Sequence, residues 1–374
     1  MHIKSIAPSF LRAFLGAACA GLLLNSTAEA LTCSGTYFPP KGQSTSYQKK
    51  RTASAVGLSS GIVTDLKNTI LAGRWAVWRH GYLVHNQGAF NTKTEIKSAR
   101  KTFHAATIGA LIRQGKIDSI HQPLTDWDAG VAGGPRNCHL DASLWHAMTQ
   151  TTAFDEAGLC PEDLWAYSDA NPPVINRVAA RAWRGTNATN YTSNYKEVIG
   201  GALLDRIGAS GWSTSVKSDG IRLSMDLEDL GRFGLLMANG GRWNGTVIVP
   251  EWFVVELSTK QTYGIQPNFD NANDGHTGLT EEDFPAGSPY GYFTWVNSEQ
   301  DLFPEADPTW AEARGANGNI LLWDGTSGVV MAILASFDKF APAETRPGFA
   351  LKVTPVVNVL QASIIGPNPL VSCE

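Results

Sequence analysis

Strand-like segments near both ends of the chain enclose a long helical middle, and this order constrains the fold most strongly. A hairpin is predicted at 75–87, with a turn at His80 and Gly81, and a second hairpin is predicted at 320–337. The sequence between them alternates helical patterns with loops rich in glycine and asparagine. We therefore expect an α+β fold with a central antiparallel sheet built from both chain ends and an inserted, mostly helical region.

Apolar spacing and end signals predict helices in three places before the C-terminus. These lie at 60–71, 98–114 and 227–239. Strand character returns at 290–296, and an amphipathic helix with apolar residues from Val353 to Ile364 closes the chain. We expect one domain, 31–374, with a sheet layer of about 31–97 plus 288–374 and a helical region of about 98–287.

The first thirty residues have the pattern of an export signal. Lys4 and Arg12 precede an apolar run at 13–24, which is too short to cross a bilayer, and small residues follow at 28–30. We expect a periplasmic or extracellular protein without a stable membrane span. The net charge of −4 gives no basic footprint for nucleic acid.

Four cysteines remain after the proposed signal, and they allow three pairings. They are Cys33, Cys138, Cys160 and Cys373. An exported chain can keep disulfides. Cys138 and Cys160 flank the 144–152 segment, so we expect them to pair. The histidines lack zinc-protease spacing, so we expect neither a metal nor a cofactor.

Ser98 and Lys101 form the strongest candidate for catalytic chemistry. A serine hydroxyl needs a base to become a nucleophile, and residues three apart share one helix face. Ser46 and Lys49 have the same spacing, but no apolar helix follows them. The segment 57–61 fits a Gly-x-Ser-x-Gly elbow, but it lacks a preceding strand.

Longer segments resemble the serine β-lactamase and penicillin-binding protein superfamily, in particular its class C-like branch of esterases and 6-aminohexanoate-dimer hydrolases. The segments run in the same order, at 98–117, 144–152, 220–224, 226–241 and 245–252. The resemblance implies the β-lactamase/DD-peptidase fold. It also implies a pairing of Cys33 with Cys373, because both chain ends belong to the sheet layer of that fold.

The resemblance implies that Ser98 is the nucleophile and Lys101 the base. It also requires a tyrosine that moves protons beside Lys101. Tyr191 is preferred because a Gly-Gly helix follows it, with Ser193 at a substrate-contacting position where asparagine is common. Tyr167, followed by Ser168 and Asp169, is the alternative.

After the serine–lysine pair and the tyrosine, the family has a third motif, which lies on a strand and completes the oxyanion hole. We place it at 313–316, where Arg314, Gly315 and Ala316 are expected near the substrate, as is Trp295 from the strand before it. The backbone N–H groups of Ser98 and Ala316 would bind the oxyanion. His276 is the alternative for this motif.

The implied function is hydrolysis of a small-molecule or peptide-like ester or amide through an acyl-enzyme. Ala313 stands where the family has a cation, so we expect weak hydrolysis of β-lactams. A D-alanyl carboxypeptidase or β-lactamase is one alternative. A non-catalytic penicillin-binding-like sensor or scaffold is the alternative from another class.

Overall fold

The computed structural model describes most of the chain after residue 32. The described ranges are 33–42, 48–70, 73–127, 137–156, 158–185, 191–217, 220–268, 288–334 and 349–373. Of 33, 191–193, 349–352 and 373 only the backbone is described. The proposed export signal and His276 lie outside these residues.

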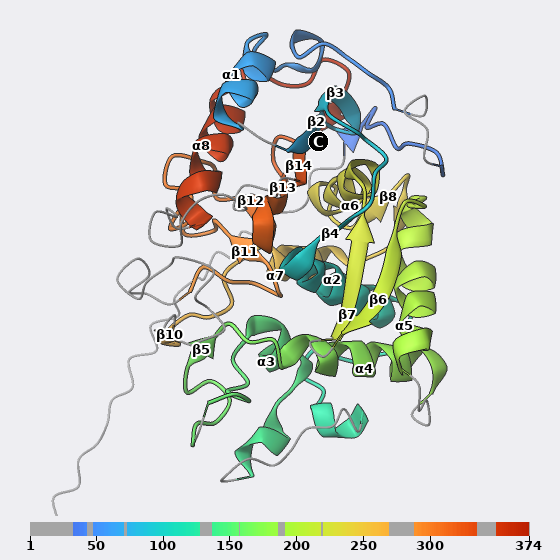
Figure 1. The fold of residues 1–374 in the computed structure, drawn as a ribbon, viewed down its shortest axis with the longest axis vertical. Coiled ribbons are helices and arrows are strands. Elements are labelled where there is room, and N and C mark those ends of the chain that lie inside the picture. Colours follow the sequence, from blue (N-terminus) through green and yellow to red (C-terminus); the bar gives the residue numbers. More distant parts are fainter. Residues whose placement is uncertain are drawn as a thin grey trace, which may run out of the picture.

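The core of the fold is a six-stranded antiparallel sheet built from both ends of the chain (Figure 1). Its strands, in spatial order, are β11 (Trp295–Val296), β12 (Trp310–Gly315), β13 (Asn319–Asp324), β14 (Val329–Leu334), β2 (Arg74–Arg79) and β3 (Tyr82–Gln87). In Figure 1, α1 (Ile62–Thr69) and α8 (Phe349–Ala362) lie on one side of this sheet and α6 (Leu227–Ala238) on the other. The α+β fold with a sheet from both chain ends is confirmed.

The hairpin of β2 and β3 shows how local sequence sets this sheet. His80 and Gly81 both have left-handed backbone, with φ of 48° and 79°. Such two-residue turns match the twist of the strands they join. A Cβ on Gly81 would lie 1.8 Å from the carbonyl oxygen of Tyr37, so this position requires glycine.

Most of the remaining elements lie, in the order of the sequence, between β3 and β11, the strands at the two edges of the sheet. The helices are α2 (Arg100–Arg113), α3 (Leu144–Thr149), α4 (Asn171–Arg184), α5 (Tyr191–Ile199) and α7 (Glu251–Leu257). A smaller sheet joins β4 (Thr94–Glu95), β7 (Gly220–Met225) and β6 (Ser213–Lys217), and β5 (Trp165–Ala166) pairs in parallel with β10 (Pro267–Asn268). The smaller sheet lies largely within the range expected to be helical. Within the described residues, no helix has the length and apolar content needed to cross a membrane.

The strand expected at 290–296 is shorter than predicted. Only Trp295–Val296 pairs as a strand, because Phe293 has a left-handed φ of 51° and turns the chain just before it. The aromatic residues of 290–296 favour a strand. They give no sign of the turn at Phe293.

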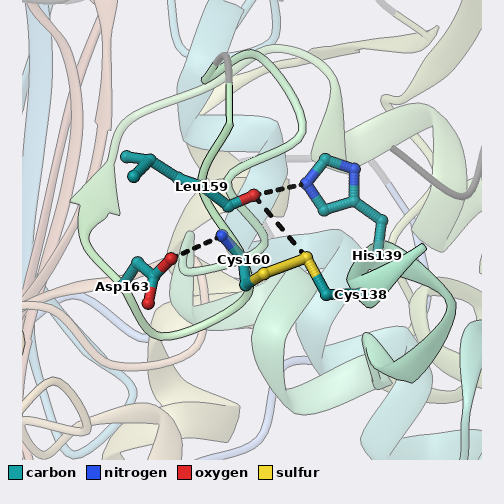
Figure 2. The surroundings of a disulfide bond; sticks show 5 residues. All are labelled: Cys138, His139, Leu159, Cys160 and Asp163. Atoms are coloured by element: carbon teal, nitrogen blue, oxygen red, sulfur yellow. Dashed lines mark hydrogen bonds between the residues drawn. A yellow bond between two sulfur atoms is a disulfide. The ribbon is translucent and has the colours of Figure 1, made fainter. Parts of the chain in front are cut away.

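One of the two expected disulfides is present in the described side chains (Figure 2). Cys138 and Cys160 are bonded, with their Cα atoms 5.5 Å apart. The carbonyl oxygen of Leu159 accepts a hydrogen bond from Nε2 of His139 at 3.0 Å, and Oδ2 of Asp163 accepts one from the backbone N–H of Cys160 at 2.7 Å. The Cys138–Cys160 pairing is confirmed.

The chain ends meet where the second disulfide was expected. β1 (Cys33–Ser34) pairs with β15 (Ser372–Cys373), and Cys33 lies directly opposite Cys373. Residues opposite each other on antiparallel strands have Cα atoms about 4.5 to 5.5 Å apart, which a disulfide can span. The bond itself stays a prediction.

Arg79 joins three parts of the chain that are distant in sequence. Its buried guanidinium donates to the carbonyl oxygens of Val56, Gly57, Ser327 and Gly366 at 2.8 to 3.0 Å. We expect Arg79→Met to lower the free energy of unfolding by about 2 kcal/mol, because several carbonyls would lose their donor. Urea unfolding measures the change, with the exposed Arg242→Met as control. An equal effect of the two substitutions would contradict the role of Arg79.

At the start of α6, the buried N-cap Asp226 lies close to the buried Asp229 of the first turn, and their charges oppose each other. Asp226 accepts a hydrogen bond from the backbone N–H of Asp229 at 2.9 Å, and Asp229 accepts from those of Ser210 and Gly211. Burial, and then the charge of Asp226, raises the pKa of Asp229 to about 7. The folded chain thus retains a proton that the unfolded chain releases near pH 4.

We therefore expect this carboxyl to favour folding below about pH 4 and to lose that contribution as the pH rises to about 7. Asp229→Asn should flatten the fall of the unfolding free energy over this window. Urea titrations at several pH values measure the slope. An unchanged slope in the variant would show that Asp229 titrates normally.

Candidate active site

Ser98 lies in a tight turn between β4 and α2. The short 3-10 helix η3 (Lys97–Ala99) contains it, and α2 continues directly from η3. Lys97 has a left-handed φ of 55°, which is strained for a residue with a side chain. Its ammonium contacts the Glu95 carboxylate at 3.1 Å. The turn places Ser98 at the start of the central helix.

Lys101 lies in the first turn of α2, three residues after Ser98. Its side chain is 1% exposed, and its Nζ lies 2.9 Å from Oδ1 of Asp169. The same nitrogen lies 3.7 Å from the ring centroid of Tyr167. Because residues three apart share a helix face, Ser98 lies on the face that carries these contacts. A serine, an amine, a phenol and a carboxylate thus lie around one helix start.

The 167–169 loop is held in place by the turn that follows α3. The Gln150 amide accepts a hydrogen bond from the backbone N–H of Ser168 at 3.1 Å and donates one to its carbonyl oxygen at 3.2 Å. The Ser168 hydroxyl donates to the Asp155 carboxylate. Both bonds of Gln150 fix the loop backbone, so they fix the points from which Tyr167 and Asp169 project.

The pKa of Asp169 reports the charge around this group. Burial by itself would raise it, but the positive charges of Lys101, Arg100 and Arg222 outweigh burial and hold the pKa below its ordinary value. Asp169 is therefore ionised at neutral pH and pairs with the ammonium of Lys101.

The structure places Tyr167, the alternative considered from the sequence, beside Lys101, and the preference for Tyr191 stays a prediction. Tyr191 begins α5, and its side chain and that of Ser193 are outside the described atoms. Asn171, Pro172 and Pro173 follow Tyr167 closely, and such a run of asparagine and proline is more typical of a loop than of a helix. They form the first turn of α4, where proline is tolerated because the first N–H groups have no partner within the helix.

The end of β12 lies against the turn that holds Ser98. A Cβ on Gly315 would lie 2.1 Å from the carbonyl oxygen of Ile96 and 3.0 Å from the backbone nitrogen of Ala99. The Asn319 amide donates to the carbonyl oxygens of Ala316 and Glu95, at 2.9 and 3.3 Å. The segment 313–316 is therefore adjacent to Ser98, where its assignment as the third motif requires it.

Arg314 and Trp295, both expected at the substrate, are largely buried. The Arg314 side chain is 5% exposed and forms a two-point ion pair with Glu312, through bonds of 2.8 and 2.7 Å. Trp295 is 2% exposed and stacks on Tyr167. Sequence reasoning missed Glu312 and Gln150. The only signal for Glu312 was its spacing from Arg314, because residues two apart on a strand share a face.

His104 is a buried polar residue of α2 with a structural role. Its Nε2 lies 3.3 Å from the carbonyl oxygen of Ile221, which can only accept, so Nε2 carries the proton and Nδ1 accepts from the Tyr195 hydroxyl at 2.5 Å. Burial, and then the charge of Arg100, lowers the pKa of His104 to about 3. Among the described residues, no group of three or more histidine, cysteine or acidic side chains could hold a metal ion.

Comparison with known proteins gives matches of structure only. No family model and no curated protein sequence matches the chain. A β-lactamase from Mycobacterium bovis is 14% identical with a TM-score of 0.58, over 82% of this chain and 100% of that one. A penicillin-binding protein from Bacillus halodurans is 14% identical with a TM-score of 0.54, over 81% and 100% of the two chains.

A third similar structure is EstCE1, described as a hydrolase with promiscuous acyltransferase activity. It is 9% identical with a TM-score of 0.57, over 82% of this chain and 99% of that one. At these identities the likeness concerns the fold. The chain has the fold of the serine β-lactamase and penicillin-binding protein superfamily.

Proposed function

We propose that the protein is a serine hydrolase that cleaves an ester or amide through an acyl-enzyme on Ser98. The observation that carries the proposal is the contact of Lys101 with both Tyr167 and Asp169, on the helix that begins at Ser98. A buried amine beside a serine and a phenol is an arrangement that activates a nucleophile. The similar structures include the hydrolase EstCE1 and the β-lactamase from Mycobacterium bovis.

The reaction has two halves in this scheme. The Ser98 oxygen attacks the carbonyl carbon while its proton passes by way of Tyr167 to Lys101, which at the same time gives one of its own protons to the paired Asp169 carboxylate. The backbone N–H groups of Ser98 and Ala316 stabilise the oxyanion. The C–O or C–N bond then breaks, and the leaving alcohol or amine takes the proton. Water attacks the acyl-enzyme by the same route and restores Ser98.

The substrate in this proposal is a small ester or amide rather than a β-lactam. Ala313 is fully buried and carries no charge, and the guanidinium of Arg314 is engaged by Glu312. This segment of β12 therefore offers little to a substrate carboxylate. Export to the periplasm or beyond the cell is part of the proposal and rests on residues 1–30.

The choice of tyrosine gives a direct test. We expect Tyr167→Phe to lower kcat for p-nitrophenyl butyrate by about a hundredfold, the scale of a lost proton-transfer group. Tyr191→Phe should leave kcat within a factor of about two, and nitrocefin should be a poor substrate. For both variants, kcat is obtained from initial rates divided by the concentration of active sites. A damaging Tyr191→Phe with a harmless Tyr167→Phe would restore Tyr191 to the role.

A further inference from the structure

The Glu312–Arg314 ion pair is built into the sheet beside the site. Both residues lie on β12 and share one face because they are two apart. Their side chains are 0% and 5% exposed, and two parallel bonds link guanidinium to carboxylate. Such a two-point contact fixes the plane of the guanidinium as well as its position.

Trp295 connects this ion pair to the catalytic groups. It lies opposite Glu312 in the register of β11 with β12, and the Arg314 guanidinium carbon lies 4.8 Å from its ring centroid. The Trp295 ring stacks on Tyr167, with centroids 6.1 Å apart and planes 21° apart. The ring centroid of Tyr167 in turn lies 3.7 Å from the Nζ of Lys101.

Two stacked rings therefore lie between two cations. Aromatic faces carry negative electrostatic potential, so each cation attracts the ring that it faces. Arg314 holds the Trp295 ring, and that ring limits how far the Tyr167 ring can move from Lys101. Gln150 fixes only the backbone of the neighbouring Ser168. Trp165 and Tyr290 also contact the Tyr167 ring, tilted or edge-on to it, and Trp295 is the ring that lies nearly parallel to it.

We propose that Glu312, Arg314 and Trp295 are positioning residues that hold Tyr167 against Lys101. This inference rests on the proposed function, because it assigns a purpose to the geometry of Tyr167. None of the three needs to touch the substrate. Their effect passes through the tyrosine, so it should appear in proton transfer and not in substrate binding.

The test removes the Glu312–Arg314 ion pair without leaving an unpaired buried charge. Glu312→Gln alone would leave Arg314 uncompensated, whereas replacing both partners of a buried ion pair by apolar residues is often neutral for stability. We expect the double variant Glu312→Met with Arg314→Met to lower kcat for p-nitrophenyl butyrate roughly tenfold, with KM nearly unchanged. The pH profile of kcat should also shift. Fluorophosphonate titration counts the folded active sites.

Trp295 provides the second arm of the experiment. Trp295→Leu should reproduce the fall in kcat and the shifted pH profile, and Trp295→Phe should recover most of both because it keeps a ring in the stack. Lys260→Met is the matched control. Lys260 is a buried cation that pairs instead with Asp301 at 3.3 Å and lies over the Tyr263 ring. Its removal should leave the pH profile unchanged.

The outcomes separate this inference from the proposed function. If the unmodified chain neither hydrolyses the ester nor reacts with the fluorophosphonate, the proposed function fails. If it does both and the double variant keeps the original kcat and pH profile, the positioning role is wrong. A rise in KM with unchanged kcat would also overturn it, because Arg314 would then be a substrate-binding residue.

Discussion

Ser98→Ala should reduce kcat for p-nitrophenyl butyrate by about 10³-fold or more, the scale seen when a catalytic nucleophile is removed. The loss follows because no covalent intermediate can form without the serine oxygen. The fold should persist, since only one hydroxyl is removed from a partly exposed position at the start of α2. The unfolding free energy should change by less than about 0.5 kcal/mol.

Ser59→Ala is the control for this substitution. Ser59 lies in the competing Gly-x-Ser-x-Gly segment, and its hydroxyl accepts a hydrogen bond from the backbone N–H of Gly61 at 3.3 Å. That contact is typical of a turn at the start of a helix. The control should keep its activity. If Ser98→Ala retained most of the rate while Ser59→Ala lost it, the nucleophile would be misassigned.

Gly315→Ala should lower kcat by about 10² to 10³-fold, the combined scale of a displaced reacting group and a lost oxyanion donor. A Cβ at this position would lie 2.1 Å from the carbonyl oxygen of Ile96, so β12 and the Ser98 turn would have to separate. That movement would displace the backbone N–H of Ala316 from the oxyanion. Binding of substrate should suffer less than turnover.

Gly325→Ala supplies a control in the same sheet. Gly325 lies in the turn between β13 and β14, and a Cβ there would meet no atom within 4 Å. The control should therefore keep both its stability and its rate. A Gly315→Ala protein with normal kcat would show that β12 does not contribute to the oxyanion site.

The sheet and its main helices could be predicted from the sequence because their signals are local. The His80-Gly81 turn defines the first hairpin, and apolar spacing defines α2 and α6. The order of these elements, with strands at both ends, then leads to the observed sheet. The turn at Phe293 could not be predicted in this way, because nothing in its neighbours requires a left-handed residue there.

The site was predictable only in part, because its groups meet over long sequence distances. The spacing of Ser98 and Lys101 is local and visible. The approach of Tyr167 to Lys101 depends on the Gln150 turn and on β5 pairing with β10, neither of which has a local signal. The Glu312–Arg314 pair was not predicted, because the resemblance places Arg314 near the substrate and gives Glu312 no role.

Covalent labelling of the full chain tests the central claim most directly. A fluorophosphonate probe, followed by proteolysis and mass spectrometry, should place the adduct on Ser98. Labelling of Lys101→Met should be far slower, because the serine would lack the adjacent amine that activates it. An adduct on Ser59, or no adduct on a folded chain, would contradict Ser98 as the nucleophile.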